Sequence, residues 1–172
     1  MARKIVVLGI GALLGAMALT GCSSDLSEEQ VAEALKPMTV ADESKIQEKP
    51  AQEFCSSMLT SYGKYGEAIT LRAQREAQAE GGEYTKDDFI TNVLDQQSAV
   101  QEIEIVTGET KISDNSELEA LRVEFREPSK NIIEAYNDAK EAKDIGTLDK
   151  NIATWEDNVL PVVIECANLV KK

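Results

Sequence analysis

Residues 51–73, AQEFCSSMLTSYGKYGEAITLRA, decide the fold class because their apolar side chains recur at three- and four-residue steps. That spacing places side chains on one face of an α-helix, so the stretch predicts a long amphipathic helix. The helix should run from about residue 51 to 80, where Gly81 and Gly82 stop it. Its buried stripe is expected to consist of Cys55, Met58, Leu59, Tyr62, Ile69 and Ala73.

The same period continues to the end of the chain and predicts three further helices. The second should begin after a cap at Thr85 and end at Gly108. The third should begin after a cap at Ser116 and end at Gly146, and the fourth should open at Thr147.

No segment of the chain alternates between apolar and polar residues as a β-strand would. Four long amphipathic helices joined by loops of several residues predict an all-α fold, an antiparallel up-down four-helix bundle over residues 51–172. Pro128 and Pro161 fall inside the third and fourth helices, where proline kinks or breaks the helix.

A polar segment, residues 22–50, precedes the predicted bundle and is interpreted as a flexible tether interrupted by Pro37 and Pro50. Ser27 and Gln30 have the spacing of a capping box, so a short helix is expected to follow Ser27. A flexible chain of this length spans about 30 Å on average, which suits a spacer.

The start of the chain has the pattern of a targeting segment, with two basic residues and an almost continuously apolar run over residues 5–19. The residues at the end of this run, Leu19-Thr20-Gly21-Cys22, resemble the lipobox of bacterial lipoproteins. The resemblance implies that residues 1–21 are a signal peptide, cleaved before Cys22, and that Cys22 carries a diacylglycerol thioether.

The same resemblance implies an extracytoplasmic protein that covalent lipid anchors to a bacterial membrane. That membrane is the cell membrane, or the outer membrane in a cell that has two. Two acyl chains make such anchoring stable, where one would be marginal. Two alternatives stay open: an uncleaved membrane helix, because the apolar run is barely long enough to span a bilayer, and an ordinary secretory signal with a chance cysteine.

The chain is strongly acidic, with 18 basic and 31 acidic residues and a net charge of −13. Loss of residues 1–21 would leave −15, because that segment carries two basic residues and no acids. Nucleic acid and anionic lipid headgroups repel such a domain. The expected partners are basic proteins, cations or neutral molecules, and an envelope protein is the first expectation.

Two cysteines remain once Cys22 is assigned to lipid. Cys55 lies near the start of the first long helix, and Cys166 lies near the end of the last one. In an up-down bundle these two ends are neighbours, and an oxidising compartment allows them to pair. The expected disulfide closes a loop of about 110 residues and contributes about 4 to 5 kcal/mol by chain entropy. The alternative is two separate buried thiols.

The composition argues against most catalytic chemistry. The absence of histidine excludes Ser-His-Asp and Cys-His catalysis and histidine metal sites. The sequence also has no Cys-x-x-Cys, no glycine-rich phosphate loop and no EF-hand calcium loop. We therefore expect a non-enzymatic protein without a cofactor or a metal.

Two short motifs look like two of the three motifs of serine β-lactamases and penicillin-binding proteins. They are Ser61-x-x-Lys64 and Ser113-Asp114-Asn115, but the third motif, Lys-Thr-Gly, is missing. That family also needs a sheet beside its serine, and this chain is too short and too helical to supply one. No catalytic residue is therefore assigned.

Acidic residues gather between the second and third predicted helices and include Glu102, Glu104, Glu109 and Asp114. Such a cluster is usually solvated surface, with favourable charge at a helix start. The alternative is a partner-binding acidic turn that receives a basic protein or a divalent cation.

Aromatic residues and glycines gather on the first long helix, in the order Tyr62-Gly63-Lys64-Tyr65-Gly66. Glycines there indicate close helix packing or a local break. The alternative is a ligand cleft edged by Tyr62, Tyr65 and Trp155.

These features predict a lipoprotein that acts as a non-enzymatic binding module of the bacterial envelope. The alternative function is a carrier that holds a small apolar ligand between its helices. A binding module should expose an apolar or acidic patch, whereas a carrier should contain an internal pocket.

Overall fold

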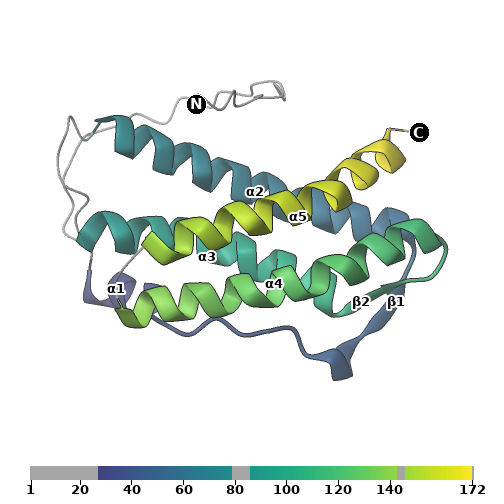
Figure 1. Ribbon diagram of the computed structural model, residues 1–172, viewed down its shortest axis with the longest axis horizontal. Coiled ribbons are helices and arrows are strands. Elements are labelled where there is room, and N and C mark those ends of the chain that lie inside the picture. The colour runs from purple at the N-terminus through teal and green to yellow at the C-terminus, as the bar shows by residue number, and fades with distance from the viewer. Residues whose placement is uncertain (1–26, 79–85, 143–145, 172) are drawn as a thin grey trace.

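The computed structural model describes residues 27–78, 86–142 and 146–171, which are mostly helical. Five helices pack against one another, together with a short 3₁₀ turn at residues 43–45 and two three-residue strands (Figure 1). The elements are α1 (Glu28–Ala34), β1 (Gln47–Lys49), α2 (Ala51–Gln78), α3 (Lys86–Gly108), β2 (Thr110–Ile112), α4 (Ser116–Ala142) and α5 (Gly146–Val170).

The four long helices contact each other in a closed ring. α2 packs against α3, α3 against α4, α4 against α5, and α5 returns to α2, while α1 lies against α3. The core fills the space inside this ring, and its largest fully buried side chains are aromatic and aliphatic residues from all four helices: Trp155, Tyr136, Phe54, Phe125, Met58, Ile90, Ile103, Leu118, Ile132, Ile133 and Leu148.

A small parallel sheet corrects the expectation of a purely helical chain. Gln47 lies opposite Thr110 and Lys49 opposite Ile112, so β1 and β2 pair over three residues. Strands of this length carry no readable alternation, and their pairing joins segments about 60 residues apart. The sequence pattern therefore contains no signal for them.

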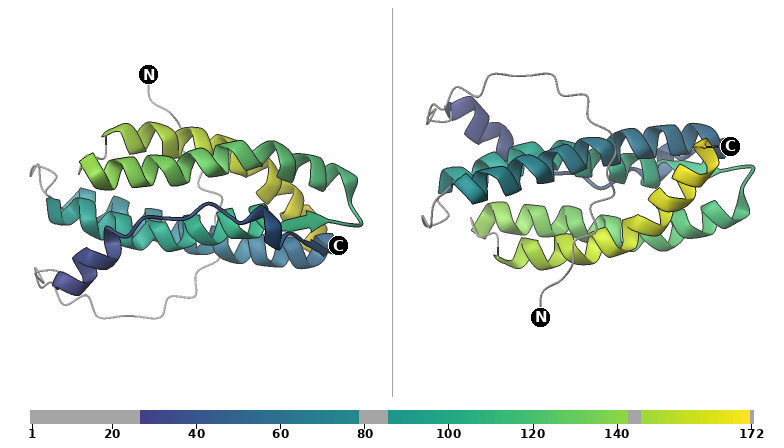
Figure 2. Two further views of the ribbon diagram at one scale, coloured as in Figure 1. Left: turned by 90° about the horizontal axis from the view of Figure 1, so that it is seen from below. Right: turned by 90° about the horizontal axis from the view of Figure 1, so that it is seen from above.

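The interpretation of residues 22–50 as a flexible spacer is wrong for the described part, residues 27–50. The predicted capping box is present, because Ser27 Oγ accepts from the Gln30 amide at 3.2 Å and Gln30 Oε1 accepts from the Ser27 amide at 2.9 Å. Beyond α1, an extended segment runs along α3 to β1 (Figure 2). It is fixed because Met38 and Ala41 are each 8% exposed and its backbone bonds to α3 and α4.

The C-terminus of α3 is capped from another helix. Its last turn carries no basic residue, so the final carbonyls need donors from elsewhere. Arg122 and Arg126 of α4 supply them, donating to the carbonyls of Thr107 at 2.6 Å and Gly108 at 2.7 Å. Two cations at a helix C-terminus also suit the helix dipole.

The segment after β2 holds the starts of two helices. Asp114 Oδ1 accepts the Ala51 amide at 2.7 Å, which caps α2 from a position 63 residues away. Asn115 Oδ1 accepts the Leu118 amide at 3.0 Å and is the cap of α4. Ser116, predicted as that cap, is instead the first residue of α4.

Two other predicted boundaries need correction. Gly146 is the first residue of α5 and not the end of the preceding helix. Pro128 does not break α4, which continues from Ser116 to Ala142. α5 contains Pro161 and bends so that its last part turns toward the start of α2 (Figure 2). A proline that lacks an amide hydrogen and crowds the preceding turn explains such a bend.

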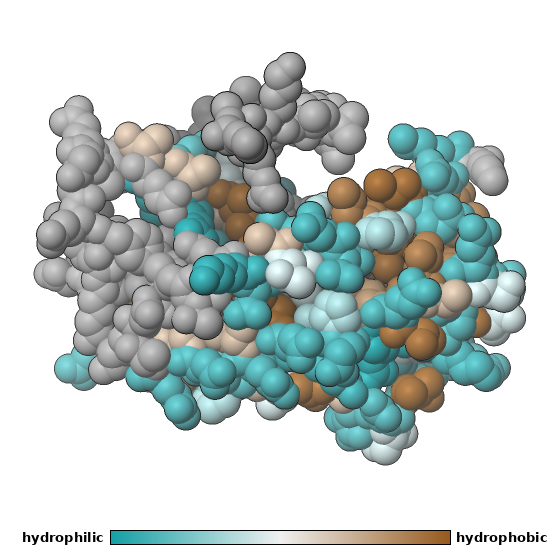
Figure 3. All heavy atoms as spheres, viewed as in Figure 1, coloured by the Kyte–Doolittle hydropathy of each residue, from teal (hydrophilic) through white to brown (hydrophobic). Residues whose placement is uncertain are grey.

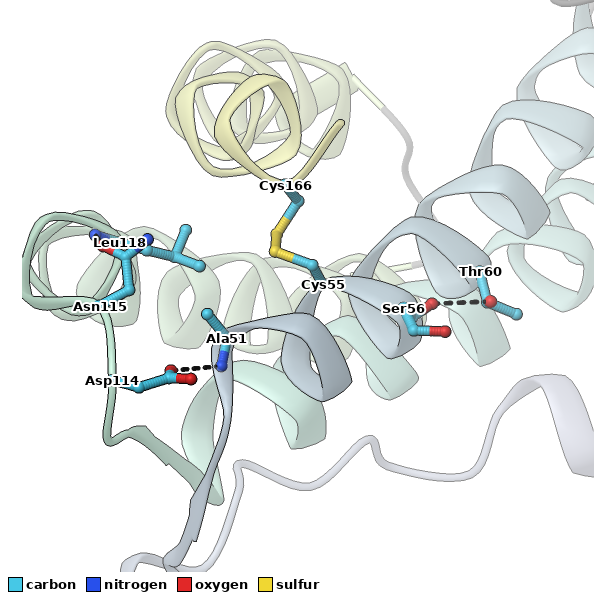
Figure 4. The surroundings of a disulfide bond; sticks show 8 residues. All are labelled: Ala51, Cys55, Ser56, Thr60, Asp114, Asn115, Leu118 and Cys166. Carbon is cyan, nitrogen blue, oxygen red and sulfur yellow. Dashed lines mark hydrogen bonds between the residues drawn. A yellow bond between two sulfur atoms is a disulfide. The ribbon is translucent and has the colours of Figure 1, made fainter. Parts of the chain in front are cut away.

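The predicted disulfide is present between Cys55 of α2 and Cys166 of α5 (Figure 4). Their Cα atoms are 4.8 Å apart, and both residues are fully buried. The bond lies one turn after the Asp114 cap on Ala51, so the start of α2 is held both covalently and by a hydrogen bond.

Part of the apolar surface remains uncovered. Apolar side chains gather toward the C-terminal end of the molecule on the face shown in Figure 3. Leu160 and Ile164, one turn apart on α5, are 45% and 51% exposed. Among the described helices, none combines the length and the apolar character needed to cross a lipid bilayer.

We expect reduction of the disulfide, or Cys55→Ala, to lower the melting temperature by about 8 to 20 °C. A cross-link that closes a loop of this size contributes about 4 to 5 kcal/mol, and each kcal/mol shifts the melting temperature of a domain this large by about 2 to 4 °C. The measurement is thermal unfolding, with Cys55→Ala/Cys166→Ala as the control for a lone unpaired thiol. Two free thiols at these positions in unreduced protein would contradict the pairing.

Candidate functional site

The segment of residues 35–46 lies between α3 and α4, and we call it the strap (Figure 2). It is extended over residues 37–42 and then enters the 3₁₀ turn at residues 43–45. The two helices form the strap groove that receives it. In an extended chain, successive residues direct their backbone N–H and C=O groups to opposite sides. The strap can therefore bond to both helices at once.

Lys36 and Met38, two even-numbered strap residues, bond to α4 through their backbone. Asn137 contacts both backbone groups of Met38: its Oδ1 accepts the Met38 amide at 2.8 Å, and its Nδ2 donates to the Met38 carbonyl at 3.0 Å. One turn further along α4, Lys140 Nζ donates to the Lys36 carbonyl at 2.6 Å and to Gln97 Oε1 at 2.8 Å. Burial lowers the pKa of Lys140 to about 8, so its ammonium charge is retained at neutral pH.

Thr39 and Ala41, two odd-numbered strap residues, bond to α3 through their backbone. Gln101 Oε1 accepts the Thr39 amide at 2.9 Å, and Gln101 Nε2 donates to the Thr39 carbonyl. Glu104 Oε1 accepts the Ala41 amide at 3.2 Å. Gln101 and Asn137 thus hydrogen-bond to the backbone of neighbouring strap residues from opposite sides. Two flanking strands would bond to a central strand in the same way.

The far end of the strap is acidic and meets two cations. Glu43 Oε1 accepts from Arg126 at 2.9 Å and from Lys130 at 3.1 Å, both on α4. These cations lower the pKa of Glu43, with the hydrogen bond from Lys130 as the largest cause. Glu43 is solvent-exposed, so this pairing adds little stability and serves mainly to orient the strap.

Gly108 allows the closest approach of the strap to the helices. A Cβ atom added there would lie 2.1 Å from the Cβ atom of Ala41, far inside contact distance. Glycine is therefore required at this position by space, and the strap residue facing it must be small.

Glu104 is the buried carboxylate of the groove, with 0% exposure. Burial raises its pKa, and the side-chain hydroxyl of Ser129, the Ala41 amide and the charge of Arg126 only partly oppose that shift. Glu104 and Ser129 are therefore buried polar neighbours inside the groove.

The strap also leaves space on both sides near its start. A hollow of about 270 Å³ lies on the α3 side, where Gln97 and Gln101 line it. A second hollow of about 450 Å³ lies on the α4 side, where Asn137 and Lys140 line it. The strap is thus narrower than the groove at this end.

The four acids of the predicted acidic turn all have partners within the chain. Glu102 accepts from Lys64 at 2.7 Å, Glu109 accepts the Asp42 amide at 3.3 Å, and Asp114 caps α2. Glu104 is buried, so the expectation of a solvated acidic face is wrong for this residue. Glu104 lies on the side of α3 that the strap covers, so it is buried. The number of acidic residues in a stretch of sequence does not show which of them are covered.

Tyr65 and Trp155, two of the residues expected to line a ligand cleft, fill that space themselves. Tyr65 and Trp155 are 2% and 1% exposed and stack edge to face, with ring centroids 4.9 Å apart. Tyr62 is half-buried, with its ring 6.1 Å from that of Tyr65. Because Tyr65 and Trp155 occupy the space between their helices, the cleft prediction is wrong for these two residues.

The glycines of α2 are not positions of close packing. A Cβ atom at Gly63 or Gly66 would have no atom within 4 Å, and α2 runs unbroken through both. The interpretation as tight packing or a break is therefore wrong.

The residues that resemble β-lactamase motifs have other contacts. Ser61 Oγ donates to Glu102 at 3.2 Å, and Lys64 pairs with the same carboxylate. Asp114 and Asn115 cap helix starts. The two motifs are also far apart. Asp114 of the second motif contacts α2 at Ala51, whereas Ser61 of the first motif lies about 15 Å further along the helix, at a rise of about 1.5 Å per residue.

The sequence reasoning missed the groove residues Gln97, Gln101, Asn137 and Lys140. Each is a polar residue on a helix, where solvated surface is the ordinary interpretation. Their contacts join positions 43 to 104 residues apart, so local patterns give no signal for them. The predicted lipidation site, Cys22, lies outside the described residues.

Within the described part of the chain, no group of three or more acids or cysteines is arranged to hold a metal ion. The chain matches no protein-family model, no curated protein and no solved structure. The strap groove is thus defined by its own geometry alone.

We expect Glu104→Gln to stabilise the protein at pH 7 and to lose this advantage toward pH 4. Burial raises the pKa of Glu104 above its ordinary value of 4.5, so the folded state holds the proton more tightly than the unfolded state. The resulting stabilisation is complete below pH 4.5 and is lost as the pH rises through the folded-state pKa. Glutamine keeps the acceptor for the Ala41 amide and has no charge to bury.

Thermal unfolding from pH 4 to 8 measures this difference. Glu102→Gln is the matched control, because it removes an exposed pair with Lys64 that contributes about 1 kcal/mol or less. A Glu104→Gln variant that is less stable than wild type at pH 7 would contradict the prediction.

We expect Gly108→Ala to lift the strap, because the new methyl group and Ala41 cannot occupy the same space. Trypsin should then cleave faster after Lys45, and the melting temperature should fall. Gly66→Ala is the control. Its new methyl group would contact no other atom, and alanine in a helix interior raises the stability of the helix by up to about 1 kcal/mol relative to glycine. Equal trypsin resistance in Gly108→Ala and wild type would rule the close approach out.

Proposed function

We propose that the protein is a bacterial lipoprotein, anchored by lipid on Cys22 outside the cytoplasm, that acts as a non-enzymatic binding module for another envelope protein. The lipobox-like residues 19–22 support the anchor. The Cys55–Cys166 disulfide supports an oxidising compartment, because such bonds persist mainly outside the cytoplasm.

One observation carries the choice of binding module over ligand carrier: among the described residues, the expected cleft is filled by its own aromatic side chains, whereas other apolar side chains are exposed. Tyr65 and Trp155 occupy the space that a carried ligand would need. Outside, Val40 of the strap is 40% exposed and Ile164 of α5 is 51% exposed. Exposed apolar side chains on a monomer point to contact with another macromolecule when they gather in a patch.

We further propose that the four long helices form an antiparallel up-down bundle that serves as a rigid support. The closed ring of contacts from α2 to α5 supports this arrangement. The net charge of −15 that remains after loss of residues 1–21 keeps such a body away from anionic lipid headgroups, so its faces stay available to a protein partner.

We expect Cys22→Ser to abolish incorporation of labelled palmitate and to leave precursor or released protein. Serine offers no thiol for the thioether bond, and an unacylated chain lacks the anchor. The readout is metabolic labelling followed by detergent partitioning, with Cys55→Ser as the matched cysteine control that keeps its lipid. Labelling that persists in Cys22→Ser would reject the lipoprotein assignment.

Site-specific photo-crosslinking on intact cells tests the binding role. A photoreactive residue at position 40 or 164 should capture a defined protein, because both side chains are exposed and apolar. The same residue at Thr60, an exposed polar position of α2, should capture none. Capture from neither position, together with a stoichiometric small molecule extracted from the purified protein, would favour the carrier.

A further inference from the structure

We propose that the strap groove is a binding site for an extended polypeptide segment of a partner protein, and that the strap is an exchangeable occupant of this site. The proposal rests on the binding role above and adds to it a site and the chemistry of the partner. The partner segment takes the place of residues 35–46 between α3 and α4.

The groove recognises backbone rather than side chains. Gln101 and Asn137 each bond to the N–H and the C=O of one strap residue, and Glu104 and Lys140 each bond to one further backbone group. Every extended segment offers these groups at the same spacing. This is the way in which extended peptides add to a sheet edge, with side-chain amides in place of the edge strand.

The strap is held mainly by these polar contacts. Only Met38 and Ala41 of its apolar residues are buried, whereas Val40 and Ile46 are 40% and 43% exposed. Each hydrogen bond contributes about 1 kcal/mol net, because water replaces it when the strap leaves. Segments with few buried apolar contacts open at a low free-energy cost.

Release of the strap leaves the helices in place. The strap ends at Ile46, before β1, and α2 begins at Ala51 under the Asp114 cap. Four residues later, the Cys55–Cys166 bond ties α2 to α5. The Asp114 cap and the disulfide therefore hold the start of α2 in place when residues 35–46 open.

An incoming segment can gain contacts that the strap does not make. The two hollows beside Met38 and Pro37 leave space along both walls that the strap does not fill. This unfilled space gives a partner the means to compete with a strap that is attached to the same chain.

Two positions limit the occupant's sequence. The residue at the place of Ala41 must be small, because Gly108 lies against it. The residue two positions later should be acidic, because Arg126 and Lys130 face it. The expected partner motif is therefore a small residue, any residue and then an acid, within an extended segment.

The test uses the full chain purified in detergent and a fluorescent peptide of residues 35–46, LKPMTVADESKI, as the probe. A release variant, Ala41→Glu/Glu43→Lys, places a carboxylate beside Glu104 and a cation against Arg126 and Lys130. It alters the strap and leaves the groove unchanged. Fluorescence anisotropy should show at least tenfold tighter binding of the probe by this variant than by wild type, whose own strap competes at a millimolar effective concentration.

Two controls assign the binding to the groove. Gln101→Ala/Asn137→Ala, added to the release variant, should weaken binding at least tenfold, because about 1.4 kcal/mol of lost hydrogen bonding suffices for that factor. A probe in which Thr39 and Val40 are both alanine should bind as well as the original, since the groove reads their backbone. A probe that carries the two release substitutions should not bind.

Three results would overturn the proposal. The first is a release variant that is folded by circular dichroism but does not bind the probe. The second is a strap that stays resistant to trypsin in that variant, because the strap then has not left the strap groove. The third is a dimer in light scattering that depends on Gln101 and Asn137, which would make a second copy the occupant in place of a partner. None of these results bears on capture at position 164 or on lipid labelling at Cys22, so the general binding role is judged separately.

Discussion

The Cys55–Cys166 bond is the constraint on which the arrangement of the helices depends. It joins the beginning of the first long helix to the end of the last one, so the ring from α2 to α5 is closed covalently. The bend of α5, which contains Pro161, turns the end of that helix toward α2. The core gains stability from such a closure, because the bond restricts the unfolded chain.

A second centre of organisation lies where α3 ends. Arg122 and Arg126 satisfy the last carbonyls of α3, and Arg122 also binds both oxygens of Glu119 at 2.7 Å. The strap passes this point against Gly108, and β2 pairs with β1 directly after it. The polar groups of four segments are thus satisfied together, so a change at this centre should affect the strap, the sheet and the start of α2 at once.

The contrast between the two sides of the molecule bears on its role. Between α2 and α5 lie the Cys55–Cys166 bond, the aromatic pair of Tyr65 and Trp155, and the hydrogen bond that Tyr65 donates to Glu156 at 2.8 Å. Between α3 and α4 the contacts to the strap are polar and directed at its backbone. An apolar core of this kind is permanent, because opening it exposes all of its surface to water. The polar groups of the strap groove can replace their hydrogen bonds to the strap with hydrogen bonds to water at little free-energy cost, which is the property that a binding groove requires.

The sequence by itself determined the helical class, the capping box of α1, and the pairing of Cys55 with Cys166. These follow from local spacing and from the topology that spacing implies: apolar residues at helical intervals, a cap three residues from its partner, and cysteines at ends that must meet. Only the tertiary structure decided that residues 27–50 pack against α3 and α4, that β1 meets β2, that Glu104 is buried, and that Tyr65 and Trp155 fill their own cleft. Each of these outcomes depends on contacts between positions 40 or more residues apart. A polar residue on a helix has the same local pattern whether water or a strap covers it, because burial is a property of the neighbours that folding brings and not of the residue's place in the sequence.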